Sequence, residues 1–284
     1  MPTNIIRAII NIVRQPKFEL MAYSRSHNRA NNMGEALEEY IKDVFAGTVG
    51  LNDENARNTQ LSQTFSYLGN QNNPPDIIIR GGDAIEVKKT ESPVSDLALN
   101  SSYPKAKLFS GSRMITAECR KCEEWTEKDL IFAVGVCKNN ILSQLSFVYG
   151  VDYAAGADTY ERIETIISNG VNSIPDVEFA DTNELARVNR IDPLGITYLR
   201  VRGMWGIRNP VRTFDYIYSP VDDAKFNFMA IINSDKFNSF PEADIAELQD
   251  LVGKTDNLNI ENIKIKDPNN PARLNEAVLI RFAV

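Results

Sequence analysis

Three charged side chains on one short segment have the types and spacing that metal-dependent chemistry requires. The sequence PPDIIIR, a Gly-Gly-Asp turn and AIEVKK predict two strands joined by a tight turn within residues 74–89. Asp76 lies at the start of the first strand, and Glu86 and Lys88 lie two residues apart on one face of the second. Two carboxylates brought together by such a turn favour Mg²⁺. The neighbouring lysine can orient or deprotonate a water and stabilise charge on a phosphate.

These groups are the ones that metal-assisted hydrolysis of a phosphodiester needs. The order Asp76, nine residues, Glu86, one residue, Lys88 matches the PD-(D/E)XK nuclease signature, with Pro75 before the aspartate. An ordinary hairpin that carries Glu and Lys at its edge for solubility is the alternative interpretation.

A helix expected over residues 33–46 adds a third acidic group. At about 100° per residue, its apolar side chains gather around Leu37, and Glu38 lies at the rim of this face. Glu38 is therefore a tentative metal ligand, and a rim glutamate with no role is the alternative. The same projection places four charged residues toward water: Glu35, Glu39, Lys42 and Asp43.

The elements around the hairpin predict a mixed α/β core. Apolar spacing predicts helices over 5–13, 33–46, 159–174 (ending near Gly170) and 241–253, a hairpin over 129–149, and a strand over 195–205. This mixture of helices and strands predicts an α/β/α or α+β core, in which helices flank a mixed central sheet. The match to the PD-(D/E)XK signature implies an α/β restriction-endonuclease-like form of this core. We also expect one domain over 1–284, with a helical extension at about 1–30, a catalytic core at about 31–215 and an appendage at about 216–284.

The composition limits the possible classes of protein. The chain has 284 residues, of which 43% are hydrophobic and 24% charged, as in globular proteins. Its three cysteines are too few for a disulfide framework, which favours the cytoplasm. No apolar run approaches the ~18 residues of a membrane span, so no membrane association is expected. The single histidine, His27, excludes a metal site with several histidines.

The cysteines allow a second metal hypothesis. Cys119 and Cys122 form a Cys-x-x-Cys pair, and Cys137 and His27 are the groups available to complete a zinc site. The alternative is a segment with one or two buried thiols and no metal.

Five long segments of the chain together resemble the NgoPII group of type II restriction endonucleases. They are NRANNMGEALEEYIKDVF, NNPPDIIIRGGDAIEVKK, LALNSSYPKAKL, ECRKCEEWTEKD and DPLGITYLRVRGMW, within roughly residues 4–215. The resemblance implies a PD-(D/E)XK fold, Mg²⁺ dependence, cleavage of double-stranded DNA at GGCC, and a companion methyltransferase. It also implies that Asp76 and Glu86 hold the metal with the carbonyl of Val87, and that Lys88 is catalytic.

The net charge of −7 argues against a general nucleic-acid binder, but the arginines are concentrated locally. Six lie between 187 and 212, with one acid among them: Arg187, Arg190, Arg200, Arg202, Arg208 and Arg212. Arg200 and Arg202 would project from one face of a strand ~6.6 Å apart, near two base-pair rises. Each guanidinium fork matches the O6 and N7 acceptors of guanine, although pairing with an acid is equally compatible.

Three further residues are candidate DNA contacts. Arg208 follows a glycine-flanked turn and can reach a phosphate or another base. Trp205 can stack on a base, and a core or hinge position is the alternative. Lys105 lies in a hydroxyl- and lysine-rich segment suited to phosphates, and an ordinary surface loop is the equal alternative. A symmetric target favours a two-fold homodimer, and a monomer that cuts the strands in turn is the alternative. Rival functions are another PD-(D/E)XK nuclease (repair, nicking or modification-dependent) and a non-catalytic DNA-binding module.

Overall fold

The fold is described from a computed structural model that covers residues 3–21, 32–70, 73–99, 101–112, 114–182 and 184–284. Its helices are α1 (Ile5–Arg14), α3 (Met33–Ala46), α4 (Glu54–Thr64), α5 (Ala117–Lys121), α6 (Gly150–Tyr153), α7 (Ala157–Asn172), α8 (Pro210–Thr213), α9 (Ser234–Asn238) and α10 (Glu242–Val252).

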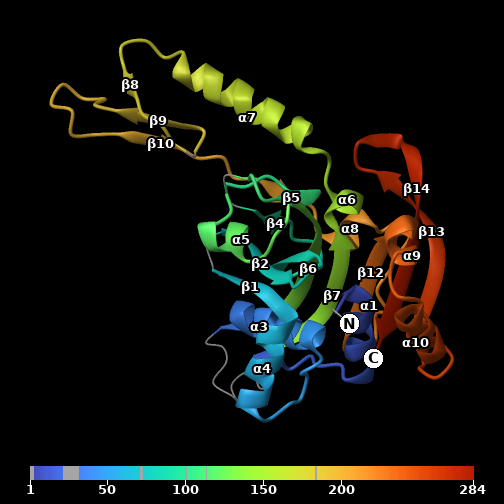
Figure 1. Ribbon diagram of the computed structural model, residues 1–284. Helices are drawn as coiled ribbons and strands as arrows, with labels where there is room; N and C mark the ends of the chain where they lie inside the picture. Colours follow the sequence, from blue (N-terminus) through green and yellow to red (C-terminus); the bar gives the residue numbers. More distant parts are fainter. Residues whose placement is uncertain (1–2, 22–31, 71–72, 100, 113, 183) are drawn as a thin grey trace.

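A mixed sheet forms the centre of the molecule (Figure 1). Its order is β1 (Phe65–Asn70), β2 (Asn73–Ile79), β3 (Ala84–Thr90), β6 (Glu127–Lys138), β7 (Ile141–Tyr149), β12 (Asn227–Asn233), β14 (Asn270–Ala283) and β13 (Asn259–Asp267). β5 (Lys107–Phe109) also pairs with β6. β3 runs parallel to β6, and β7 parallel to β12, whereas the other neighbouring strands are antiparallel. The predicted mixed sheet with flanking helices is therefore confirmed.

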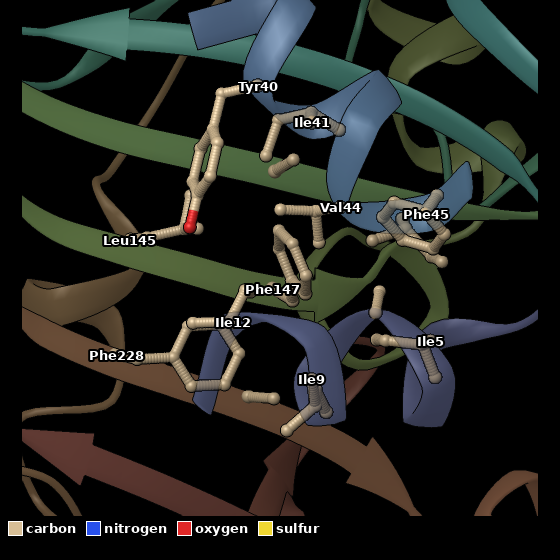
Figure 2. Close-up of a cluster of buried hydrophobic side chains, with 14 of the residues drawn as sticks. Ile5, Ile9, Ile12, Tyr40, Ile41, Val44, Phe45, Leu145, Phe147 and Phe228 are labelled. Carbon is tan, nitrogen blue, oxygen red and sulfur yellow. The ribbon is translucent and has the colours of Figure 1, made fainter. Parts of the chain in front are cut away.

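Two amphipathic helices cover one face of this sheet. α1 and α3 pack against each other and against β7 and β12, with Ile9, Val44 and Phe147 among the buried side chains (Figure 2). The Phe147 ring lies between those of Phe45 and Phe228, at centroid distances of 5.7 and 5.3 Å. A second apolar cluster covers the opposite face and includes Ile78, Phe132 and Met229. Burial on both faces holds the central strands in place.

The start and end of the predicted helix at 33–46 are confirmed. The side chain of Asn32 accepts hydrogen bonds from the amides of Gly34 and Glu35, and Gly47 ends the helix in a left-handed conformation. The predicted exposure of Asp43 is wrong, because its carboxylate is fully buried. It accepts hydrogen bonds of 2.6 Å from Arg57 Nε of α4 and 2.5 Å from Thr48 Oγ1. A partner from another helix thus allows an acid to face inward.

Other predicted elements are confirmed, with changes at their ends. The hairpin at 129–149 is formed by β6 and β7, whose turn residues Asn139 and Asn140 both have positive φ. Helix 241–253 corresponds to α10, and α7 continues two residues beyond Gly170. The strand expected over 195–205 is too long, since only Leu199–Val201 is extended and paired.

A small second unit extends away from the central sheet (Figure 1). It consists of α7 and a three-stranded sheet of β8 (Glu178–Phe179), β9 (Ala186–Asn189) and β10 (Leu199–Val201), and we call it the arm. No residue of α7 is buried. Just after the arm, β11 (Gly206–Ile207) pairs with β4 (Leu97–Ala98) and returns the chain to the main body.

The C-terminal segment is part of the sheet. Residues 216–284 contribute β12, β13 and β14, and β12 lies beside β7 near the centre. The division into extension, core and appendage stays a prediction. Within the described residues, no helix has both the length and the apolar character of a membrane span.

Candidate active site

The catalytic hairpin predicted from the sequence is formed by β2 and β3. Ile77 pairs with Ile85 and Ile78 with Ala84, so the ladder ends before Val87. The carboxylate of Asp76 continues the connection, because its Oδ2 accepts a 2.6 Å hydrogen bond from the amide of Val87. A residue in an extended strand points its N–H and C=O to the same side. The carbonyl of Val87 therefore also faces Asp76.

Glu86 and Lys88 lie side by side on β3, as the spacing predicts. Lys88 Nζ donates to Glu86 Oε1 at 2.5 Å. The other carboxylate oxygen, Glu86 Oε2, is buried and has no hydrogen-bond partner among the described residues. A buried carboxylate oxygen without a partner is costly, so this atom is suited to an additional ligand.

The electrostatics of the hairpin also favour a cation. Burial, reinforced by the Glu86 carboxylate, raises the pKa of Asp76 to about 7. Burial lowers the pKa of Lys88, but the carboxylates of Glu86 and Asp76 outweigh it, and the net pKa is above the ordinary value. In the metal-free site the two carboxylates therefore favour the ammonium form of Lys88.

The donor set fits Mg²⁺. The hairpin offers the Asp76 carboxylate, the unpartnered Glu86 Oε2 and the carbonyl of Val87, which are the hard oxygen ligands that Mg²⁺ takes. When bound, such an ion polarises a phosphate and lowers the pKa of water.

Glu38 lies near this site but is engaged elsewhere. Its carboxylate contributes to the raised pKa values of Asp76 and Lys88, so it faces the same region. However, it pairs with Lys42 Nζ at 2.8 Å. In the part of the chain that the structure describes, no three acidic, histidine or cysteine side chains form a metal cluster. The structure therefore does not bring Glu38 into a three-carboxylate centre, and its role as a ligand stays a prediction.

The hairpin opens into a cleft of about 660 Å³. Asp76, Glu86 and Lys88 line it, together with Glu184 and Arg202 from the base of the arm. The cleft is next to a second hollow, of about 900 Å³, under α7, and Glu184 lines both. The candidate catalytic residues therefore line a cleft that adjoins the hollow under the arm.

The structure places Lys105 in this cleft, beside the catalytic hairpin. Its Nζ lies 4.2 Å from the ring centroid of Tyr103. Burial lowers the pKa of Lys105, against the opposing effect of Glu164 and other acids that include Glu86. Among the described residues, no carboxylate lies within ion-pair distance of Lys105. An ammonium with this environment is available to an incoming anion.

The candidate base-reading arginines share one partner that the sequence analysis missed. Arg200 and Arg202 both bind the carboxylate of Glu184, so they do lie on one side of the strand. Arg200 is paired across the small sheet with Arg187 of β9. Glu184 comes close to them only because β9 and β10 are neighbours, and no local pattern reveals that pairing.

Trp205 and Arg208 lie farther along the chain. Trp205 packs edge-on against Tyr160 and Tyr103, and its indole N–H donates to Glu164 Oε1 at 3.1 Å. This aromatic cluster joins α7 to the main body. Arg208 is exposed, does not line the cleft, and is held through its carbonyl by the hydroxyl of Tyr153. DNA contact by Trp205 and Arg208 stays a prediction.

The zinc hypothesis for the cysteines is wrong for the described residues. Cys119 belongs to the cluster on one face of the sheet and Cys137 to the cluster on the other. Cys122 packs near Cys119, and His27 lies outside the described residues. The sheet separates Cys137 from the Cys-x-x-Cys pair, so the three thiols cannot share one ion.

The hairpin, its cation-binding groups and the adjoining cleft are features of a metal-dependent hydrolase of phosphodiesters. Comparisons with known proteins identify the family. Residues 3–266 match the NgoPII restriction endonuclease family, which extends the expected resemblance well beyond residue 215. The chain is also 53% identical over 281 residues to the type II restriction enzyme NgoPII of Neisseria gonorrhoeae, covering 98% of this chain and 99% of that protein. No solved structure matches.

The chain therefore belongs to the NgoPII restriction endonuclease family of type II restriction enzymes, which are site-specific deoxyribonucleases.

Proposed function

We propose that the protein cleaves unmodified double-stranded DNA at GGCC in a Mg²⁺-dependent reaction, through a PD-(D/E)XK core. The observation that carries this proposal is the convergence of Asp76, Glu86 and Lys88 in an open cleft, where the buried Oε2 of Glu86 has no partner among the described residues. The family supplies the type of substrate, and GGCC comes from the resemblance to the NgoPII group.

Each group in the cleft has a proposed role. Asp76, Glu86 and the carbonyl of Val87 hold the metal, and Glu38 supports them through the charge it adds to the site. Lys88, which stays protonated, orients the attacking water and stabilises the charge on the phosphate as the 3′ oxygen leaves. Lys105 binds a phosphate of the same strand, because no described carboxylate pairs with its ammonium and it lines the same cleft as the hairpin.

Base recognition is assigned to the arginines at the base of the arm. Arg200 and Arg202 donate to guanine O6 and N7, which every base pair of GGCC offers in the major groove. Arg208 reaches a phosphate or a further base, and Trp205 stacks at the edge of the DNA. The presence of Arg202 in the lining of the same cleft as Lys88 supports this arrangement.

A palindromic target favours a two-fold homodimer with one active site for each strand. The arm supports this proposal, because the isoleucines of α7 are exposed in the single chain, with Ile166 58% accessible. A companion methyltransferase protects the same site in host DNA. Both activities belong in the cytoplasm, where host and incoming DNA meet.

The direct test is to incubate the protein and Mg²⁺ with unmethylated phage DNA and to sequence the fragment ends. Ends confined to GGCC support the proposal. Ends at another fixed sequence would retain the activity and reject the specificity. Cleavage only of nicked, damaged or modified DNA would favour a different nuclease of the superfamily, and binding without any cleavage would favour a DNA-binding module.

A further inference from the structure

Glu184 links the two candidate base-reading arginines through a single carboxylate. Its Oε2 accepts from Arg200 Nε at 2.9 Å, and its Oε1 accepts from Arg200 Nη2 at 2.5 Å and from Arg202 Nε at 2.8 Å. The Glu184 side chain is only 11% exposed, whereas those of Arg200 and Arg202 are 49% and 61% exposed. The carboxylate is therefore enclosed while the two cations face solvent.

The geometry of these contacts leaves the recognition edge of each arginine free. A guanidinium has five N–H donors, and its end-on edge uses one hydrogen from each terminal nitrogen. Arg200 meets Glu184 side-on, through Nε and Nη2, and Arg202 meets it through Nε. Within the described residues no other acceptor binds either group. Both arginines thus retain the paired donors that match guanine O6 and N7.

The backbone fixes Glu184 at this position. Thr182 Oγ1 accepts a 3.1 Å hydrogen bond from its amide. The amide of the next residue, Leu185, donates to the carbonyl of Val201, which lies between the two arginines. The carboxylate is therefore carried on the segment that runs beside β10, and Glu184 and Arg202 both line the cleft that holds Asp76 and Glu86.

We propose that Glu184 is a positioning residue for base recognition, which holds Arg200 and Arg202 with their end-on edges ready for two guanine contacts. This inference rests on the proposed function of the two arginines. A free arginine loses much side-chain freedom when it forms a bidentate contact. Because Glu184 orders both arginines before DNA binds, less conformational entropy is lost on binding. The resulting gain in affinity is restricted to DNA that offers guanines at the right spacing.

The test compares Glu184→Gln with Glu178→Gln, a control on the same small sheet whose carboxylate pairs with Arg190 at 3.5 Å. Binding to a GGCC duplex and to single-mismatch duplexes is measured in Ca²⁺. We expect Glu184→Gln to lower the cognate-to-mismatch affinity ratio about tenfold or more, with an unchanged melting temperature, and the control to leave the ratio unchanged. Glu184→Asp, which keeps the charge on a shorter side chain, is a second variant. We expect it to lower the cognate-to-mismatch affinity ratio less than Glu184→Gln does.

Two other results would overturn the inference. If Glu184→Gln tightens cognate and mismatch binding equally, Glu184 only competes with DNA phosphates for the arginines. If both affinities fall equally together with the melting temperature, its role is to hold the arm together. The variants Arg200→Ala and Arg202→Ala distinguish a failure of the inference about Glu184 from a failure of the proposed function. If these variants lower the ratio and those at Glu184 do not, only the inference fails; if none lowers it, base recognition by these arginines fails as well.

Discussion

The amide of Val87 donates a 2.6 Å hydrogen bond to Oδ2 of Asp76, which joins β2 and β3 beyond the end of their backbone ladder. This contact holds the carboxylate close to Glu86 before any metal binds. The carboxylates of Asp76 and Glu86 are thereby kept together in a largely buried position. Because two like charges are removed from water there, this arrangement lowers the stability of the metal-free protein.

That cost predicts how Asp76→Asn changes the stability of the metal-free protein. Because burial and Glu86 raise the pKa of Asp76 to about 7, the folded state binds this proton more tightly than the unfolded state, where the pKa is near 4. The contribution of Asp76 to stability is thus greatest at low pH and is lost as the pH rises through about 7. Asn is never charged, so we expect it to raise the free energy of unfolding by on the order of 2–4 kcal/mol at pH 8, and by less at pH 5.

Urea denaturation in EDTA at the two pH values measures this effect. Asp222→Asn, a substitution of an exposed aspartate, is the control and should change little at either pH. A gain for Asp76→Asn that is absent, or that is the same at pH 5 and pH 8, would contradict the electrostatic account.

Glu38→Gln tests whether the first core helix supports the metal. Since the Glu38 carboxylate acts on both Asp76 and Lys88, its loss should weaken the response to Mg²⁺ roughly 10–100-fold, as is usual for groups that support metal ligands. The measurement is the cleavage rate as a function of Mg²⁺ concentration. Glu35→Gln, in the first turn of the same helix, is the control. Glu39 is unsuitable, because it binds Arg57 at 2.7 Å. If Glu38→Gln and Glu35→Gln change the Mg²⁺ dependence of the cleavage rate equally, Glu38 does not support the metal.

Phe147→Ala tests the packing beneath the sheet. The Phe147 ring is fully buried between Phe45 and Phe228, so its removal leaves a cavity and should cost about 3–5 kcal/mol of unfolding free energy. Phe109→Ala removes the same group from a site where it is 48% exposed and should cost far less. Similar midpoints in guanidinium chloride for the two variants would show that the α1–α3 layer does not depend on this ring.

Local sequence patterns predicted the candidate catalytic hairpin and the amphipathic helices, because the residues that determine these elements lie close together in the sequence. Asp76, Glu86 and Lys88 converge through a single turn, and the caps of the helix at 33–46 are adjacent in sequence. The inward position of Asp43 could not be predicted in this way, since it depends on Arg57 from the next helix.

Long-range pairing explains what the sequence analysis missed at the site. Glu184 reaches the arginines through the pairing of β9 with β10. The strand around Arg200 is shorter than predicted, because β9 offers only four residues as a partner. The strands after residue 216 join β7 through a parallel contact between distant segments. Hydrophobic periodicity describes single elements and does not give their neighbours.

The central claim is that Asp76, Glu86 and Lys88 form the catalytic site, and single-turnover cleavage of a GGCC duplex tests it most directly. Glu86→Gln and Lys88→Met should each lower the rate in Mg²⁺ by at least about 10²–10³-fold while keeping tight, Ca²⁺-supported binding of the same duplex. The control, Lys89→Met, removes the neighbouring lysine, which pairs with Glu91 on the other face of the strand, and should cleave normally. If Glu86→Gln or Lys88→Met cleaves the duplex at a rate close to that of the unaltered protein, the hairpin is not the catalytic site.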